Sequence, residues 1–370
     1  MSSSVARVRA GLRDLRNRWV SNPEFQRWAA RFPLTRPLAR AKASDLFDLT
    51  SGFIYSQIAV AFVELDLLRA LRAGSVTSVE LAEMAAMPRE SAERLLKAGA
   101  ALGLAEPLGN GGFGLGERGA ALLGAPGVAA MVRHHAALYA DLADPLALLR
   151  RGGGGGALSR YWPYAEASGT TEDQATADYS ELMRVSQALV AEQVLNAYRV
   201  DRHRRMIDVG GGAGAFLEAV RARAPQLDLT LFDLPAVAEA AGRRFAAEGV
   251  PIQTAGGDFF RDPFPEGADL ISLIRILHDH DDAPAQALLQ RVRTALKPGG
   301  RLLIGEPMAG VRGAEKAGDA YFGMYLLAMG SGRARTPGEL AGMLRHAGFR
   351  RSWRVPTDLP LIASVMVAQA

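Results

Sequence analysis

Apolar runs and amphipathic segments alternate between residues 205 and 307, and this pattern carries most of the structural information in the chain. Short apolar runs at 206–209, 229–232, 270–276 and 301–305 predict buried strands, and the stretches between them predict helices. Strands separated by helices pair in parallel, with helices on both faces of the sheet. The sequence therefore predicts an α/β, Rossmann-like sheet, in which ligands bind at the carboxyl ends of the strands.

A helical pattern occupies residues 45 to about 125 instead. Helices predicted at 79–86 and 88–100 are followed by short apolar segments at 104–108 and 113–115 around a glycine-rich turn, which is the order of a winged helix. Winged helices often read a DNA major groove. Here the second helix balances its basic side chains with Glu90 and Glu93, so an interaction role is favoured over DNA binding.

The first 42 residues form a basic arm, with ten arginine or lysine residues and two acidic ones. Leu12, Trp19, Phe25, Trp28 and Phe32 recur at roughly helical intervals. A basic amphipathic helix of this kind can lie on an anionic bilayer. An arm packed on a second subunit and an organelle-import leader are the alternatives. We expect no membrane-spanning stretch of about 20 apolar residues and no secretory signal.

The length and composition of the chain limit its domain number and its possible metal and disulfide chemistry. A chain of 370 residues suits two domains. The absence of cysteine excludes disulfides and thiolate metal sites and fits a reducing cytoplasm. A five-glycine run at 152–156 is too flexible for a regular element and predicts a surface loop at a domain boundary. We expect the arm at 1–42, a helical domain at 43–150 and an α/β domain at 151–370.

A glycine cluster at 210–214 follows the first of the predicted strands. Glycine lets the backbone turn sharply and approach a ligand, because no Cβ stands in the way. Gly210-x-Gly212-x-x-Ala215 fits the dinucleotide fingerprint loosely. Asp233 ends the next strand, about 20 residues on, where a carboxylate can accept both ribose hydroxyls of a nucleoside. The cluster therefore predicts a nucleoside site.

Further motifs appear in a fixed order. They are Gly257-Asp258-Phe259-Phe260, His278-Asp279, Leu296-Lys297-Pro298-Gly299-Gly300 and Gly305-Glu306-Pro307. With the glycine cluster they resemble class I S-adenosylmethionine (SAM)-dependent O-methyltransferases of the plant caffeate and animal acetylserotonin type, from about residue 45 to the C-terminus. A nicotinamide enzyme would not need the Gly-Asp-Phe-Phe and His-Asp segments.

This resemblance implies SAM as cofactor, a homodimer and a winged-helix-like dimerisation domain. It implies cofactor contacts from the glycine loop and from residues near the strand ends. These are Asp208, Gly210, Gly211, Gly212, Asp233, Leu234, Gly257, Asp258, Phe259, Arg275 and Tyr179. Tyr179 and Met183 share one helical face, over the cofactor and beside the substrate, although ordinary core packing would explain the same spacing.

The family's general base matches His278, and its orienting acids match only in part. Glu306 matches one glutamate, but Ala334 stands where a second glutamate precedes the Arg-Thr pair. We therefore expect Glu306 to be the sole acidic orienter. The other five histidines read as surface or packing residues. A metal site at 278–282 is disfavoured, because two-residue spacing in a turn gives poor convergence, so no metal is expected.

An uncharged stretch at 320–329 matches the family's substrate-lining helix, with Tyr321, Met324 and Met329 as candidate substrate contacts. Methionines conform to awkward apolar ligands, but a core or a dimer interface would also use such a stretch. Segments at 23–28, 32–34, 46–49 and 52–57 resemble the carotenoid branch of the family in phototrophic bacteria. That resemblance implies methylation of the tertiary hydroxyl of an acyclic carotenoid such as hydroxyneurosporene or demethylspheroidene.

Several alternatives stay open at this point. The same chemistry could serve ring-carbon methylation of bacteriochlorophyll precursors, or another small hydrophobic alcohol or phenol. A winged-helix regulator that binds DNA is disfavoured by the intact Asp233 and His278, so no nucleic-acid partner is expected. Localisation is expected to be cytoplasmic, with peripheral contact at a membrane surface left open.

Overall fold

The computed structural model describes the backbone of residues 2–161 and 174–370, and the side chains of residues 7–160 and 186–370. The chain divides into two compact units, Met1–Ala120 and Ala121–Ala370. This division falls earlier than the expected boundary at residue 150.

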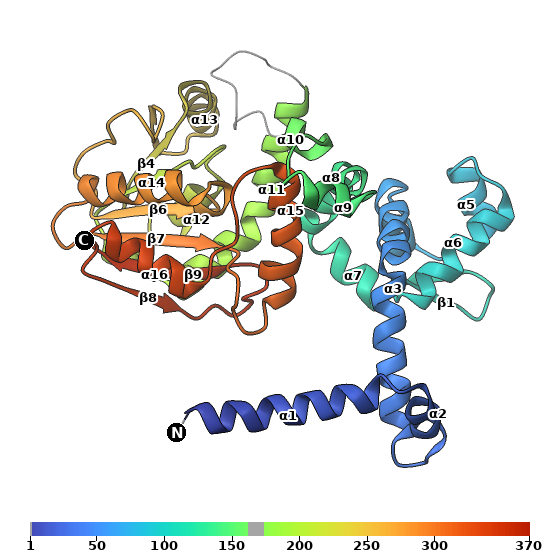
Figure 1. Ribbon diagram of the computed structural model, residues 1–370. Helices are drawn as coiled ribbons and strands as arrows, with labels where there is room; N and C mark the ends of the chain where they lie inside the picture. The colour runs from blue at the N-terminus through green and yellow to red at the C-terminus, as the bar shows by residue number, and fades with distance from the viewer. Residues whose placement is uncertain (1, 162–173) are drawn as a thin grey trace. The chain divides into compact units, whose positions relative to one another are not determined.

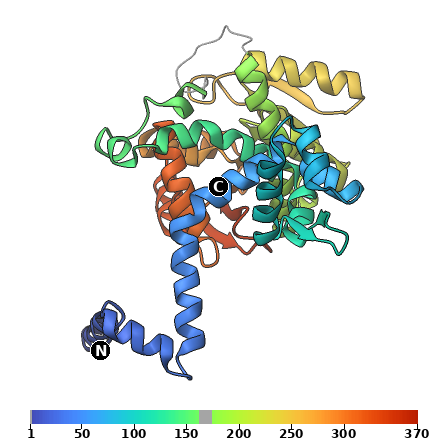
Figure 2. The same cartoon turned by 90° about the vertical axis from the view of Figure 1, so that its right-hand side faces the viewer.

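The first unit is helical (Figures 1 and 2). It contains α1 (Ser2–Val20), α2 (Pro23–Arg31), α3 (Arg36–Glu64), α4 (Leu67–Ala73), α5 (Ser78–Met84) and α6 (Arg89–Ala101). The strands β1 (Ala105–Pro107) and β2 (Phe113–Leu115) pair antiparallel around the glycine-rich turn. Two helices followed by a β-hairpin agree with the predicted winged-helix order.

The helix α3 differs from two expectations. It runs without a break through residue 42, so the expected end of the basic arm lies inside a helix. By length and composition it is apolar enough to cross a membrane, which the sequence interpretation did not predict, and only 11% of its most apolar window is buried. Leu46, Phe47, Leu49 and Phe53 are all more than half exposed.

The second unit carries the sheet (Figure 1). Its remaining helices are α7 (Glu117–Leu123, which begins in the first unit), α8 (Pro126–Leu142), α9 (Pro145–Arg150), α10 (Ala157–Tyr161), α11 (Gln174–Ala197), α12 (Ala215–Arg223), α13 (Pro235–Glu248), α14 (Asp282–Ala295), α15 (Phe322–Met329) and α16 (Pro337–His346). Short 3₁₀ turns span Val200–Arg202 and Leu277–Asp279, and a π-helical turn spans Lys316–Tyr321.

Seven strands form one sheet, in the order β5-β4-β3-β6-β7-β9-β8. The strands are β3 (Arg205–Val209), β4 (Asp228–Asp233), β5 (Gln253–Gly256), β6 (Leu270–Ile274), β7 (Arg301–Glu306), β8 (Arg351–Val355) and β9 (Ser364–Gln369). β3 to β7 pair in parallel, as predicted. β9 is antiparallel to both of its neighbours, so the whole sheet is mixed.

Side chains of the sheet alternate between two separate hydrophobic cores, one on each face. Met206, Leu229 and Leu303 pack with residues of α11, α12 and α13. Ile207, Phe232 and Ile304 pack with residues of α14 and α16 on the other face. Successive strand residues point to opposite faces, and parallel sheets are buried on both faces. This is why the strands read as continuous apolar runs.

The five-glycine run lies inside the second unit, between α9 and α10, and not at a unit boundary. The amide of Gly154 donates to the carbonyl of Leu327 at 2.9 Å. A Cβ on Gly153 would stand 2.3 Å from that same oxygen. Glycine is therefore required here for close packing against α15, as well as for loop flexibility.

Candidate active site

The predicted site residues converge at the carboxyl edge of the sheet, where β3, β4, β6 and β7 all end. The amide of Gly212, after β3, donates to Asp233 Oδ2 at 2.7 Å. The amide of Gly257, after β5, donates to the Asp233 carbonyl at 2.8 Å. The amide of His278, after β6, donates to Glu306 Oε2 at 3.1 Å. The strands therefore bring segments far apart in sequence into two adjoining clusters.

The glycine loop has the backbone that its sequence predicts. Gly210 and Gly212 adopt φ of 70° and 56°, a region that favours glycine. A Cβ on Gly211 would stand 2.7 Å from Asp208 Oδ2, so the loop lies directly against that carboxyl. A Cβ on Gly212 would meet nothing within 4 Å, so there is open space beside the loop where a ligand can approach.

Asp208 is buried under this loop. Its Oδ1 accepts a hydrogen bond from Ser272 Oγ at 2.5 Å. Burial and the charge of Asp233 raise the pKa of Asp208 to about 7, against the opposing effect of the Ser272 hydroxyl. A carboxyl with this pKa is only partly ionised at neutral pH.

Asp233 is positioned by backbone amides. Its two oxygens accept from Gly212 and Leu234, each at 2.7 Å. Burial raises the pKa of Asp233, while the two amides act in the opposite direction. The carboxylate is held at the end of β4 and has further lone pairs for a ligand's hydroxyl groups.

The Gly257-Asp258-Phe259 segment forms a tight turn after β5. Asp258 Oδ1 accepts from the amide of Phe260, and its own amide donates to Asp262, both at 2.8 Å. The Phe259 ring packs on the edges of Phe260 and His280, with ring centroids 4.6 and 5.7 Å apart. The turn presents an aromatic face beside the loop that carries His278.

Arg275 has a strained backbone, with φ of 60°, at the point where β6 ends. Such a conformation is costly for a non-glycine residue and is often found at functional sites. Its amide still donates to the Gly305 carbonyl at 2.9 Å, and its guanidinium donates to Ser186 Oγ at 2.9 Å. The positive φ of Arg275 directs the chain out of the sheet, three residues before His278.

His278 is 3% exposed and lies between two carboxylates. Its Nε2 is 3.1 Å from Asp279 Oδ1, and its Nδ1 is 3.4 Å from Glu306 Oε2. Burial alone would lower the pKa of His278, but Asp279 and then Glu306 outweigh it and raise the pKa to about 9. The structure therefore brings together the histidine and glutamate predicted from sequence and adds Asp279 as a second acid.

Glu306 is completely buried at the end of β7. Among the described residues, neither its Oε1 nor Nδ1 of His278 has a hydrogen-bond partner. Buried polar atoms without partners are rare in folded proteins, and a catalytic role is one of the explanations for them. His278 and Glu306 are therefore joined by an ion pair and by the hydrogen bond from the His278 amide, and both side chains keep further hydrogen-bonding capacity.

The candidate substrate residues lie on α15 and on the π-helical turn before it. Tyr321 and Met324 are half-buried, whereas Met329 is buried in a cluster with Leu138 and Leu148. Phe322 places its ring 5.8 Å from that of His278, edge to face. The side chains of Tyr179 and Met183, the other two candidates on this side, lie outside the described residues.

Two histidine–tyrosine pairs tie α8 to this segment, and the sequence did not suggest them. Nε2 of His134 lies 2.8 Å from the Tyr325 hydroxyl, and Nε2 of His135 lies 2.8 Å from the Tyr321 hydroxyl. Burial lowers the pKa of His134 to about 4 and also lowers the pKa of His135, so burial favours the neutral form of both rings. The burial of His134 agrees with the packing role predicted for it. Nothing in the sequence around His135 indicated that it would pair with the Tyr321 hydroxyl.

The remaining histidines have other surroundings. His203 lies 2.7 Å from the Tyr198 hydroxyl, His280 packs against the two phenylalanines after β5, and His346 is exposed. In the part of the chain that the structure describes, no group of three or more His, Asp or Glu side chains is arranged to hold a metal ion.

Comparisons with known proteins agree with this geometry. Residues 139–350 match the O-methyltransferase domain family. The chain is 43% identical to demethylspheroidene O-methyltransferase of Cereibacter sphaeroides, over 98% of this chain and 96% of that protein. It is 32% identical to acetylserotonin O-methyltransferase of Mus musculus, over 83% of each.

Solved structures show the same fold. Human N-acetylserotonin methyltransferase in complex with SAM superposes with a TM-score of 0.73 at 26% identity, over 89% of this chain and 97% of that one. The mitomycin 7-O-methyltransferase structure gives 0.72 at 28% identity, over 90% and 100%. The glycine loop, Asp233 and the buried His278 thus lie in a fold known to bind SAM, and the chain belongs to the family of SAM-dependent O-methyltransferases.

Proposed function

We propose that this enzyme methylates the tertiary hydroxyl of an acyclic carotenoid, demethylspheroidene or hydroxyneurosporene, in carotenoid biosynthesis. The observation that carries the proposal is the 43% identity to a demethylspheroidene O-methyltransferase along nearly the whole of both chains. A second demethylspheroidene O-methyltransferase, from Rhodobacter capsulatus, is also 43% identical, over 92% of this chain. Similarity that includes the N-terminal segments supports a shared substrate class more strongly than similarity of the catalytic unit alone.

SAM supplies the electrophilic methyl group, and the residues at the sheet edge fit its chemistry. Asp233 would accept the ribose hydroxyls, because its carboxylate is fixed by backbone amides at the strand end. The glycine loop would pass close to the methionine portion, since there is open space at Gly212. Asp208 would hold the loop from below, and Asp258 and Phe259 would border the adenine.

His278 would remove the proton of the acceptor hydroxyl as the new bond forms. A neutral alcohol is a poor nucleophile, and a positioned base contributes roughly 10²–10⁴-fold to the rate. The proton would reach Nε2 as the hydroxyl displaces the Asp279 carboxylate from it. Glu306 would fix the ring from the Nδ1 side and stabilise the imidazolium once it forms. Since the base must start neutral, a pKa of about 9 in the free enzyme predicts that kcat/KM rises with pH up to that value.

The acceptor wall would be aromatic and apolar. Phe322 contacts the His278 ring, and Tyr321 and Met324 flank it on the same segment. Such a surface can hold a long polyene through apolar contact, and methionine adapts to its shape. Burial raises the pKa of Tyr321, so its hydroxyl stays protonated and does not compete with His278 as a base.

The decisive experiment is identification of the product. Purified enzyme would be incubated with methyl-labelled SAM and a pigment extract from a strain that accumulates hydroxylated acyclic carotenoids, and the labelled pigment would be analysed by mass spectrometry. We expect one methoxy carotenoid. Label in a bacteriochlorophyll precursor, or in phenols only, would refute the carotenoid assignment.

We also propose that the enzyme works as a homodimer. The exposed apolar side chains of α3, including Leu49 at 78% and Phe53 at 67% exposure, form a surface that water does not favour. Monomeric proteins rarely expose contiguous apolar patches of this kind, which usually mark an interface. A second copy of α3 would cover it.

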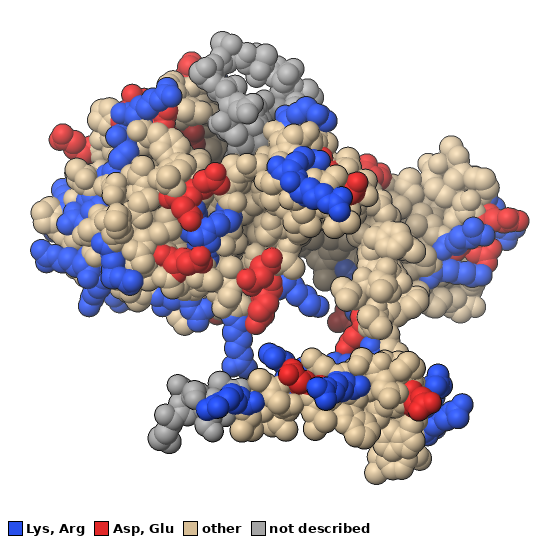
Figure 3. All heavy atoms as spheres, in the orientation of Figure 1, with Lys and Arg blue, Asp and Glu red and all other residues tan. Residues whose placement is uncertain are grey.

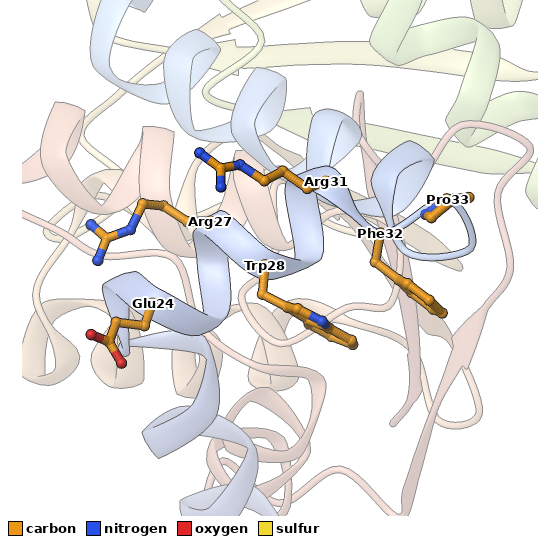
Figure 4. Close-up of a pocket in the computed structure, with 6 residues that line it drawn as sticks. All are labelled: Glu24, Arg27, Trp28, Arg31, Phe32 and Pro33. Atoms are coloured by element: carbon orange, nitrogen blue, oxygen red, sulfur yellow. The ribbon is translucent and has the colours of Figure 1, made fainter.

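We propose further that the enzyme is cytoplasmic and makes peripheral contact with a membrane surface through α1 and α2, where basic side chains outnumber acidic ones (Figure 3). Trp19, Phe25, Trp28 and Phe32 form a continuous row of rings, with centroids 5.1–5.7 Å apart. Figure 4 shows Arg27 and Arg31 on one side of α2 and Trp28 and Phe32 on another. An interfacial helix needs this combination, since arginines meet lipid phosphates while aromatic rings enter the headgroup layer. A carotenoid substrate dissolves in the hydrocarbon interior that lies beneath this layer.

A further inference from the structure

The loop that carries His278 is held by a buried arginine. Arg335 precedes α16 and has no exposed surface. Its Nη1 donates to the Leu277 carbonyl at 2.6 Å, and its Nη2 donates to the His280 carbonyl at 2.7 Å. Its Nε donates to Asp282 Oδ1 at 3.0 Å. The guanidinium therefore binds the backbone carbonyls of the residue immediately before His278 and of the residue two positions after it.

The residues just before Arg335 contact the same loop. Ser331 Oγ donates to the Asp279 carbonyl at 3.0 Å, and the amide of Gly332 donates to Asp281 Oδ1 at 2.9 Å. A Cβ on Gly332 would stand only 2.1 Å from the His278 carbonyl. We call residues 331–335 the clasp. Three of these hydrogen bonds end on backbone carbonyls of the His278 loop, and two end on the carboxylates of Asp281 and Asp282. The three carbonyl contacts fix the path of the chain on both sides of His278.

A buried arginine is costly unless each of its three nitrogens has an acceptor. Desolvation of the charge exceeds the gain from a single ion pair, and good geometry with additional hydrogen bonds is needed to compensate. Arg335 meets that demand with two carbonyls and one carboxylate. The guanidinium carries its donors on three coplanar nitrogens and so reaches three acceptors that lie apart, whereas lysine carries all of its donors on one nitrogen. This arrangement is therefore specific to arginine at this position.

We infer that Arg335 is a positioning residue for the reaction, which holds His278 in register with Glu306 and Asp279. The inference rests on the proposed role of His278 as the base. Residue 334, just before Arg335, is an alanine and supplies no acid to orient His278. Since residue 334 has no carboxylate, we infer that His278 is oriented through its backbone, which Arg335 holds by hydrogen bonds to the Leu277 and His280 carbonyls.

Arg333 provides a matched control within the same clasp. It also pairs with Asp282, at 3.1 Å, and with Glu339, at 2.8 Å, but it is half-exposed and no hydrogen bond to the His278 loop backbone is found for it among the described residues. Arg333→Gln removes one ion pair of Asp282 and leaves the two carbonyl contacts in place. Arg335→Lys keeps a buried charge but loses the fork, and Arg335→Met removes the charge.

The experiment compares these variants in full-length enzyme with demethylspheroidene and SAM. SAM affinity measured by calorimetry should stay within about twofold of wild type, because none of these residues is assigned to the cofactor. Turnover should fall roughly 10–100-fold in Arg335→Lys and Arg335→Met, the scale expected for a misplacement of about 1 Å. Arg333→Gln should stay near wild type. The midpoint of the kcat–pH profile should move in the Arg335 variants only, because His278 would lose its fixed distance to the two acids.

A double-variant cycle separates this inference from the proposed base. If His278→Gln alone has wild-type turnover, the role of His278 is wrong. If His278→Gln is impaired but Arg335→Lys adds its full loss on top, Arg335 acts elsewhere and the inference fails. We expect the double variant to be little slower than His278→Gln, since residues that act as a unit are not additive. Unchanged turnover in a folded Arg335→Lys enzyme would also overturn the inference; if Arg335→Met does not fold, Arg335→Lys alone decides it.

Discussion

The two carboxylates beside His278 should control its protonation, and each can be neutralised without changing its size. Asp279 is the nearer acid, 3.1 Å from Nε2, and Glu306 lies 3.4 Å from Nδ1. Together they raise the pKa of the ring to about 9 in spite of burial. We expect Asp279→Asn to lower that pKa more than Glu306→Gln does. In the double variant burial acts alone, and the pKa should fall below the usual 6.5.

The magnitude follows from the structure. The rise in the pKa of His278 from 6.5 to about 9 means that the site favours the imidazolium by roughly 3 kcal/mol, at about 1.4 kcal/mol per pH unit. A single opposite charge at this range typically accounts for roughly 1–3 pH units. Because the folded pKa lies above the unfolded one, this stabilisation is complete below about pH 6.5 and is lost as the pH rises through about 9.

Histidine NMR on ¹³C-labelled enzyme can follow the titration, since the chain has only six histidines. Burial is the main cause that lowers the pKa of four of them, so a signal that titrates on the alkaline side stands out. His278→Gln assigns it. Asp281→Asn is the matched control, because Asp281 accepts from Gly332 and not from His278.

Two results would refute this reasoning. One is a His278 signal that titrates below 6.5 in the wild type. The other is an unchanged midpoint in both Asp279→Asn and Glu306→Gln, which would mean that the carboxylates do not set the charge of the ring.

Three further predictions address other parts of the molecule. Asp233→Ala should weaken SAM binding by roughly 1.5–3 kcal/mol, the range for a hydrogen bond to a charged group; unchanged affinity by calorimetry in folded protein would remove Asp233 from the site. The Arg27→Gln/Arg31→Gln variant should co-sediment less with anionic vesicles than wild type does, with no change for neutral vesicles; equal sedimentation together with loss of the dimer would assign this surface to the second copy. Gly332→Ala should lower the thermal midpoint more than Gly313→Ala does, because both have positive φ but only the first places a Cβ against backbone atoms; equal losses would show that the clasp is not tightly packed.

Local sequence patterns predicted the parallel part of the sheet and the chemistry at its edge. Apolar residues recur with a different period in strands and in helices, so the two kinds of element can be told apart in the sequence. The glycines, Asp233 and His278 follow strand ends, and in a parallel sheet these ends lie at the same edge. These features depend on neighbours in sequence or on a topology that short connections enforce. For this reason the glycine loop and Asp233 could be predicted from the sequence pattern, whereas the pairing of His278 with Glu306 was implied by the resemblance to the family.

Contacts between distant segments could not be predicted in this way. Arg335 meets the Leu277 carbonyl across 58 residues, and His135 meets Tyr321 across 186. An arginine is usually exposed, so its pattern gives no reason to expect complete burial. The glycine run at 152–156 predicted a surface loop at a domain boundary, because its packing partner, Leu327, lies on a helix far along the chain. The roles of Tyr179, Met183 and the substrate residues on α15 stay predictions.

The most direct test of the proposed mechanism is turnover of demethylspheroidene by His278→Gln. SAM affinity and folding should be retained, because the cofactor residues are on other strand ends. Methyl transfer should fall by roughly 10²–10⁴, while the exposed control His346→Gln keeps the wild-type rate. A His278→Gln enzyme that methylates the carotenoid at the wild-type rate would contradict the account.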